Sequence, residues 1–173
     1  VMFERHGDGT ATDRAYEAGH RIRAYFASMM EERRSARRSD LMSEITHSTV
    51  DGIPLTDNEI IGMAVFLYAA GNETTAMLIG NALWLLDQYP EERAWLRAAP
   101  EAIPGALEEI LRFEAPVSEE ARSTTREVQI RGVTIPKGKK VLLIYGSGNR
   151  DEDAFSQSQQ FDPKRAPDRH LAF

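Results

Sequence analysis

The sequence predicts a mainly α-helical protein with a small antiparallel β-sheet, built around one long central helix. Two patterns support this class: apolar residues recur at helical spacing through residues 10–113, and from residue 122 the period of alternation falls to two. The chain has 173 residues, of which 42% are hydrophobic, so it is long enough for a domain with its own core. We expect a single domain over residues 1–173, with a helical part at 10–113 and a small sheet and meandering loop at 121–173.

Composition excludes several classes of function. A net charge of -6 argues against nucleic-acid binding. The chain contains no Cys, so these residues offer no disulfide, thiolate nucleophile or sulfur ligand. His6, His20 and His47 stand apart from any second ligand at metal-binding spacing, so we expect them at the surface. Residues 1–6 lack an apolar targeting segment, and Glu73 interrupts the apolar part of the central helix before it reaches a membrane-spanning length. We therefore expect a soluble, cytoplasmic protein with no membrane partner.

The central helix is predicted over residues 57–88. Thr56 and Glu59 form a capping box at its start, in which each side chain binds the backbone N–H of the other residue. Residues 60–70 are apolar on all sides of the helix, which is typical of a helix buried through the middle of a domain.

A polar run interrupts this helix where it should be driest. Gly71 costs about 1 kcal/mol relative to Ala in a helix interior, and the polar groups of Asn72, Glu73 and Thr74 are costly to bury. Such local inconsistencies tend to mark functional sites, and Gly71 would allow a flat molecule to approach the backbone. The alternative is that one helix ends at Gly71 and a second helix, capped by Asn72, begins there.

The other elements follow from the same rules. Helices are predicted at residues 10–38, 40–45, from 90, and 103–113, with a loop at 46–54. Short strands are predicted at 123–126, 128–131, 133–135 and 140–145, before the meander.

Two further stretches bear on function. Four Arg residues at 33–38 indicate either a solvated helix end or a docking patch for an acidic partner. Residues 146–151 suggest a dinucleotide loop, but the charge of Asp151 would face the pyrophosphate, which disfavours that function.

Periodicity alone places the polar face of helix 103–113 in solvent. Glu108, Glu109 and Arg112 lie on that face, and Glu108 with Arg112 has the i,i+4 spacing of a weak surface ion pair.

Short motifs then place the chain in a known family. Residues 70–74 read Ala-Gly-Asn-Glu-Thr on the central helix, and residues 109–112 read Glu-Ile-Leu-Arg, an E-x-x-R motif. Residues 149–151 read Asn-Arg-Asp after the sheet, and residues 161–165 read Phe-Asp-Pro-Lys-Arg. In this order and spacing they resemble the cytochrome P450 family of heme-thiolate monooxygenases, its soluble bacterial branch in particular. The resemblance covers nearly the whole chain and implies a partial cytochrome P450 fold.

The resemblance also implies roles for individual residues. Glu73 and Thr74 would be catalytic, with Thr74 hydrogen-bonding the oxygen bound at the heme iron and Glu73 relaying protons. The implied contacts to heme b are Ala70 and Gly71 at its distal face, and Arg122 and His170 at its propionates. The implied buried structural triad is Glu109, Arg112 and Arg165, which overrules the surface placement above, and the implied substrate pocket contains Phe66, Pro116 and Val117.

The implied reaction is hydroxylation of a small apolar organic substrate with O2. Electrons would come from a ferredoxin or flavoprotein reductase. In this family a Cys that binds iron follows the Leu-Ala-Phe stretch, which here is residues 171–173, and no Cys is present. We therefore expect a fragment that lacks the N-terminal part and the Cys-ligand loop, inactive by itself and with no metal ligand of its own.

Two alternatives remain at this point. His170 could replace Cys as the iron ligand, although a propionate contact or a surface position suits it better. The chain could also be a heme-free helical module that binds a partner or an apolar ligand, with no catalytic activity.

Overall fold

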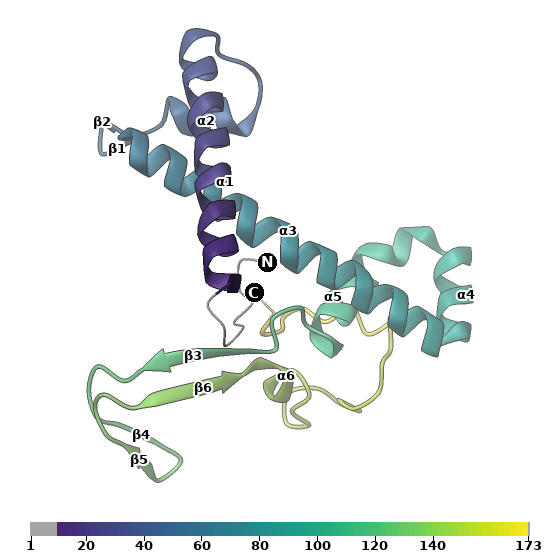
Figure 1. Cartoon of the computed structure of the whole chain (residues 1–173). Coiled ribbons are helices and arrows are strands. Elements are labelled where there is room, and N and C mark those ends of the chain that lie inside the picture. The colour runs from purple at the N-terminus through teal and green to yellow at the C-terminus, as the bar shows by residue number, and fades with distance from the viewer. Residues whose placement is uncertain (1–9, 173) are drawn as a thin grey trace. The chain divides into compact units, whose positions relative to one another are not determined.

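The computed structural model describes residues 10–172 (Figure 1). The predicted features of residues 1–6 and Phe173 lie outside this range. The helices are α1 (Thr10–Ser35), α2 (Leu41–Thr46), α3 (Asp57–Gln88), α4 (Pro90–Ala98), the 3-10 helix η1 (Pro100–Ala102), α5 (Ile103–Phe113) and α6 (Tyr145–Gly148). The predicted class, mainly α with small antiparallel ladders, is confirmed. Contacts group the chain into two compact units, one up to Asn72 and one from Glu73, and each is described by itself.

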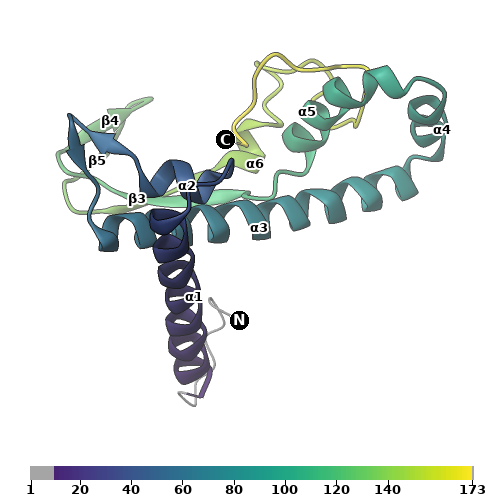
Figure 2. The ribbon, with the colours of Figure 1, turned by 90° about the horizontal axis from the view of Figure 1, so that it is seen from above.

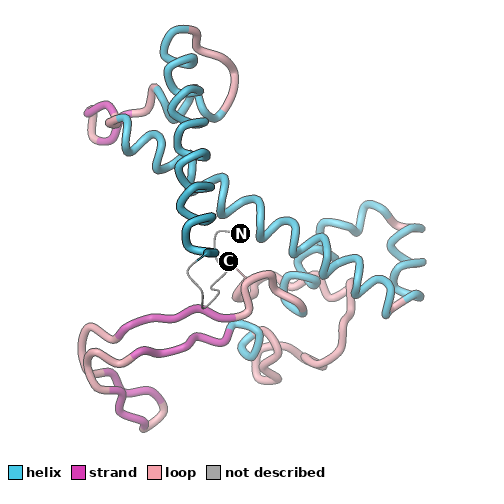
Figure 3. Tube along the Cα trace, in the orientation of Figure 1, coloured by secondary structure: helices cyan, strands magenta, loops and turns pink. Residues whose placement is uncertain are grey.

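The strands of the described residues form three two-stranded antiparallel ladders. They are β1 (Thr49–Val50) with β2 (Ile53–Pro54), β3 (Glu119–Ser123) with β6 (Lys140–Ile144), and β4 (Val128–Ile130) with β5 (Val133–Ile135). Figure 3 shows the β4–β5 hairpin beyond the far end of the β3–β6 ladder.

Positive backbone angles explain the two tightest hairpins. The turn between β1 and β2 has φ of 52° at Asp51 and 80° at Gly52, and the turn between β4 and β5 has 46° at Arg131 and 82° at Gly132. Two consecutive positive φ values are the pattern of a type I′ turn, whose twist matches that of the flanking strands. The prediction of a plain loop at residues 46–54 is therefore wrong, because Asp51-Gly52 closes a short hairpin there.

The first unit has a small core of its own. Met30 from α1, Met42 and Ile45 from α2, and Ile60 and Ala64 from α3 are buried together. Asp40 caps α2 by accepting a hydrogen bond of 2.8 Å from the backbone N–H of Ser43.

The Arg residues at the end of α1 are paired within this unit. Arg33 contacts Asp40 at 2.8 Å, Arg34 contacts Asp57 at 2.5 Å and Arg37 contacts Glu44 at 3.0 Å, while Arg38 pairs with Glu32. Because acidic side chains of the chain already neutralise them, this basic cluster gives little support to a docking patch for an acidic partner.

Helix α3 runs without interruption from Asp57 to Gln88, so the alternative of two helices that meet at Gly71 is wrong. The predicted capping box is present: Glu59 accepts from the Thr56 backbone N–H at 2.8 Å, and Thr56 Oγ accepts from the Glu59 N–H at 3.4 Å. The prediction that α3 is buried on every side is wrong for the described residues. Within residues 60–70 the buried residues are Ile60, Ile61 and Ala64, while Phe66 is 67% exposed.

The second unit packs the last turns of α3 against α5. Leu85 of α3 is buried with Ile110 and Phe113 of α5 and with Phe161 of the meander. Figure 2 shows α4 leading the chain away from the end of α3 and α5 returning beside it. This packing places the polar face of α5 against the meander of residues 149–172.

Candidate functional site

The polar run of α3 is exposed in the middle of the helix. Ala70, Gly71 and Glu73 are exposed and Thr74 is half-buried. A Cβ placed on Gly71 would have no atom within 4 Å, apart from the helix's own backbone. The backbone of α3 is therefore open at Gly71 to a molecule that lies flat against it.

The three residues predicted to line a substrate pocket differ in exposure. Phe66 and Val117 are exposed, and Pro116 is half-buried in the segment between α5 and β3. All three offer apolar surface, but none of them lines the cavity described below.

Glu109 and Arg112 form a buried ion pair on α5, and both side chains are 0% exposed. Arg112 Nε donates to Glu109 Oε2 at 2.7 Å and Nη2 donates to Oε1 at 2.8 Å, which makes the contact bidentate. The other N–H groups of Arg112 donate to the main-chain carbonyls of Asn149 at 2.6 Å, Ser158 at 3.0 Å and Gln160 at 3.3 Å. All five donors of the guanidinium are thus used, and three of them hold the meander.

Arg165 joins this pair from the meander. Its Nε donates to Glu109 Oε1 at 3.2 Å, and its two terminal nitrogens donate to the carbonyls of Ser156 at 2.5 Å, Gln157 at 3.3 Å and Gln160 at 3.3 Å. Glu109 Oε1 also accepts from the Asp162 backbone N–H at 3.0 Å. One carboxylate therefore binds two guanidinium groups and a backbone amide.

The surface placement from periodicity is wrong for Glu109 and Arg112. Helical periodicity reports only which residues share a face, and here that face is covered by the meander, which is distant in sequence. Glu108 does point outward, but it pairs with His170 at 2.8 Å instead of forming the predicted i,i+4 pair with Arg112.

Arg122 lies on β3 beside an acidic partner that the sequence analysis did not single out. Its Nη2 donates to Glu120 Oε2 at 2.7 Å, and the same oxygen accepts from the Tyr145 hydroxyl at 2.9 Å. These hydrogen bonds, first that of Arg122 and then that of Tyr145, hold the pKa of Glu120 below its usual range. The hydrogen bond to Glu120 also raises the pKa of Arg122 and that of Tyr145. A signal was available, because Glu120 and Arg122 stand two apart on one strand and so share a face.

His170 is held at both ring nitrogens. Nδ1 lies 3.1 Å from the backbone nitrogen of Ala172, whose N–H donates to it. The proton of a neutral ring then sits on Nε2, which donates to Glu108 Oε2 at 2.8 Å. The ring therefore presents its N–H donor to a carboxylate.

Arg150 is a further structural residue to which the sequence analysis gave no role. Its Nη2 donates to the Phe113 carbonyl at 2.8 Å and to Glu114 at 2.6 Å, and its guanidinium lies 4.1 Å from the centre of the Phe113 ring. Its signal in the sequence is its place in the Asn-Arg-Asp motif of residues 149–151, which served to recognise the resemblance but gave Arg150 no contact.

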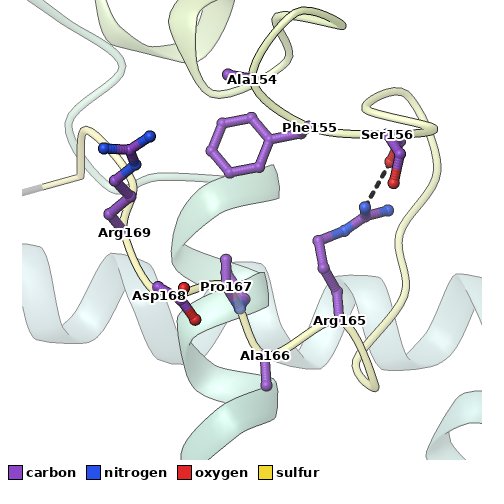
Figure 4. Close-up of a pocket in the computed structure, with 8 residues that line it drawn as sticks. All are labelled: Ala154, Phe155, Ser156, Arg165, Ala166, Pro167, Asp168 and Arg169. Atoms are coloured by element: carbon purple, nitrogen blue, oxygen red, sulfur yellow. Dashed lines mark hydrogen bonds between the residues drawn. The ribbon is translucent and has the colours of Figure 1, made fainter.

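A cavity of about 320 Å³ lies within the meander, lined by residues 154–156 and 165–169. Figure 4 shows the Arg165 side chain turned toward the Ser156 carbonyl, with the Phe155 ring between Arg169 and Ser156 in this view. Because the donors of Arg165 already bind Glu109 and loop carbonyls, this cavity has no strong donor from Arg165 to offer a ligand.

The described residues also bear on metal binding and on membrane crossing. No group of three or more His, Cys, Asp or Glu side chains among them is arranged to hold a metal ion. None of the helices in that part of the chain has both the length and the apolar character that crossing a membrane requires.

Comparison with known proteins places these features in context. A family model described as Cytochrome P450 matches residues 8–169. Cytochrome P450 130 of Mycobacterium tuberculosis is 37% identical over 166 residues, which cover 94% of this chain and 41% of that protein. A methyl-branched lipid omega-hydroxylase of the same organism is 39% identical over 153 residues, covering 88% of this chain and 36% of that protein.

Solved structures agree. CYP109E1 from Bacillus megaterium in complex with corticosterone superposes with a TM-score of 0.92 at 31% identity, over 98% of this chain and 46% of that one. P450BioI in complex with an acyl carrier protein superposes with a TM-score of 0.85 at 34% identity, over 99% of this chain and 43% of that one. The chain spans between 36% and 41% of the length of the curated relatives it matches.

Proposed function

The chain belongs to the cytochrome P450 family, and we propose that it contributes the oxygen-activating helix and the E-x-x-R core of a heme-dependent monooxygenase. The observation that carries this proposal is the unbroken passage of α3 through Gly71 with open space beside that glycine. The substrate we propose is a small apolar organic molecule, because the named relatives include a lipid hydroxylase and a corticosterone complex.

The residues present fit heme b. Gly71 leaves the backbone of α3 open, as a flat macrocycle requires. Arg122 and His170 each donate to an exposed carboxylate, that of Glu120 or Glu108, and a propionate carries the same charged group and would take its place. Arg122 and His170 would therefore hold the propionates, and Ala70 and Gly71 would face the ring.

Heme, when bound, supplies the iron that binds and activates dioxygen. The role we assign to Thr74 is to place a hydroxyl that can donate or accept a hydrogen bond beside the reacting oxygen. Glu73, whose carboxylate is exposed, exchanges protons with water and passes them toward Thr74. Phe66, Pro116 and Val117 provide apolar surface for the substrate. A ferredoxin or flavoprotein reductase is the proposed electron donor.

Hemin titration of the full chain, followed by Soret absorbance, tests the cofactor assignment. We expect Arg122→Ala and His170→Ala each to weaken hemin binding about tenfold, because each removes a hydrogen bond to a charged group. Arg126→Ala is the matched control: it removes an exposed Arg just beyond β3 and should leave the affinity unchanged. Saturable hemin binding that neither variant weakens would refute the assignment.

Thr74→Ala tests the proposed reaction in the active enzyme that contains this chain. We expect O2 consumption to continue while product formed per O2 falls at least about tenfold, because proton delivery would lose its hydroxyl. Thr75→Ala, the next residue on α3, should leave coupling intact. Fully coupled turnover by the Thr74→Ala enzyme would remove Thr74 from the mechanism.

A further inference from the structure

Asn149 lies where three parts of the second unit meet, and its side chain is 0% exposed. Its backbone N–H donates to the Tyr145 carbonyl at 2.8 Å and so ends α6. Its carbonyl accepts from Arg112 at 2.6 Å, and its side-chain Oδ1 accepts from the Leu171 backbone N–H at 2.6 Å. One residue thus connects α6, the buried pair of α5 and the end of the meander.

The orientation of the Asn149 amide is fixed by its partner. A backbone N–H can only donate, so the atom that faces Leu171 must be the oxygen. Nδ2 is buried without a hydrogen-bond partner among the described residues. A buried donor that goes unpaired is costly, so accepting the Leu171 N–H is the gain that keeps this side chain in place.

The neighbouring glycine lets the meander approach closely. A Cβ on Gly148 would lie 2.6 Å from Leu171 Cδ1, a distance that real Cβ atoms do not show. Gly148 therefore leaves room for the Leu171 side chain in its present rotamer, whereas Asn149 binds the Leu171 backbone.

Leu171 is adjacent to His170, whose ring is held by hydrogen bonds to Glu108 and to the Ala172 backbone. His170 accepts from the Ala172 N–H and donates to Glu108, so its orientation depends on where the backbone of residues 170–172 lies. Asn149 sets that position at Leu171, and the carbonyl of Asn149 is itself held by Arg112. A chain of hydrogen bonds thus runs from the Glu109–Arg112 pair through Asn149 to the backbone that carries His170.

We propose that Asn149 is a positioning residue that fixes His170 relative to the buried Glu109–Arg112 pair. If His170 binds a heme propionate, then Asn149 and, through it, Arg112 of α5 determine the position of that contact. This part of the proposal rests on the function proposed above.

Amide hydrogen exchange of the full chain tests the positioning role without any cofactor. In the native chain the Leu171 amide should exchange more slowly than that of Arg169. Asn149→Ala should speed exchange at Leu171 about tenfold relative to the α5 amide of Ile110, because it removes one hydrogen bond without changing the opening of the helix. An unprotected Leu171 amide in the native chain, or unchanged relative exchange in the variant, would overturn the proposal.

Two further variants separate positioning from general destabilisation. Asn149→Asp keeps an acceptor oxygen, so the relative protection of Leu171 should stay within about threefold of native even where overall stability falls. Equal losses of relative protection for Asp and Ala would count against the role. Asn81→Ala is the matched control, since Asn81 donates to the Glu114 carbonyl at 2.8 Å in the same unit and should not alter exchange at Leu171.

Hemin titration then tests the link to the cofactor. Asn149→Ala and His170→Ala should weaken hemin binding by similar factors, and the double variant should bind about as well as either single one, because the two residues act through one contact. Additive losses would show that Asn149 does not act through His170. If the native chain bound no hemin, the proposed function would fail, whereas the exchange data would still decide the positioning role.

Discussion

Arg112 illustrates how much one side chain can hold when every donor is used. Its five N–H groups bind Glu109 and three carbonyls of the meander, and its guanidinium also lies 5.2 Å from the centre of the Phe155 ring. Lys offers only three donors from a single nitrogen, without the planar fork that matches a carboxylate.

We predict that Arg112→Ala destabilises the second unit by about 3–5 kcal/mol, because it leaves the Glu109 carboxylate buried with less compensation. Arg112→Lys should recover only part of this loss. Urea denaturation measures both values. Arg37→Ala, which breaks the exposed pair with Glu44, is the control and should have little effect. A loss for Arg112→Ala as small as that of the control would contradict this prediction.

For single residues, the sequence predicted which side chains take part in the triad better than it predicted whether they are buried. The E-x-x-R motif pointed to Glu109 and Arg112, and the family resemblance added Arg165; the structure brings all three into contact. Periodicity alone put Glu109 and Arg112 in solvent, because it cannot register a loop that arrives from residues far along the chain. Asn149 was noticed only as part of a motif, since its partners are mostly backbone atoms that leave no pattern in the sequence.

Helix α5 lies against the meander so closely that one glycine is required. A Cβ on Gly105 would lie 2.9 Å from the Cβ of Ala166, which itself has a positive φ of 41°. The conflict involves Cβ atoms fixed to the backbone, so rotation of a side chain cannot relieve it.

We predict that Gly105→Ala destabilises the chain by about 1–3 kcal/mol, although Ala is the better helix former. Ala166→Gly removes the other Cβ and suits the positive φ, so the double variant should recover most of the loss. Thermal or urea unfolding of the native chain, the two single variants and the double variant measures the coupling free energy between residues 105 and 166. As a control, Gly80→Ala in α3 meets no atom within 4 Å and should be neutral or stabilising. Additive effects at Gly105 and Ala166 would argue against close packing there.

The cap of α2 should make the first unit sensitive to acid. The backbone N–H of Ser43 and then the side chain of Arg33 lower the pKa of Asp40. A carboxyl whose pKa is lower in the folded state stabilises the fold above its unfolded pKa, and that stabilisation is lost as the pH falls through the folded value. The window therefore lies below about pH 4.

We predict that Asp40→Asn, which keeps a capping oxygen, flattens the fall in stability between about pH 4 and pH 2. Urea unfolding at several pH values measures the slope, and Asp51→Asn in the β1–β2 turn is the control. An equally steep acid slope in the Asp40→Asn chain would show that this carboxyl is not responsible.

Element boundaries were predictable where the signal is local. The capping box and helical pattern gave α3 its observed limits, and Pro90 marked the start of α4. Strand β3 was placed about four residues too late, because its limits follow from pairing with β6 and not from its own residues. The β1–β2 hairpin carried an Asp-Gly signal that was assigned to a loop.

For the molecule as a whole, the chain divides within α3, and each unit has its own buried cluster. Leu85 is the fully buried residue of α3 in the second unit, among Ile110, Phe113 and Phe161.

We predict that Leu85→Ala costs the second unit about 2–5 kcal/mol through the cavity it leaves. Hydrogen exchange should then rise at the amides of α5 while those of α2 keep their protection, because α2 packs in the other cluster. Leu83→Ala, at an exposed position on the same helix, is the control. A uniform loss of protection across both clusters would show that the chain opens as one cooperative body.

The bonds of Arg112 also bear on how the second unit comes to be folded. Its carbonyl partners lie 37, 46 and 48 residues further along the chain, so each bond closes a long loop. Contacts of such long range form slowly, whereas helices such as α5 assemble from neighbours within microseconds. The Glu109–Arg112 pair would thus form first while it is still exposed to water. The slower folding of the meander would be the kinetic step that buries the pair and removes water from it.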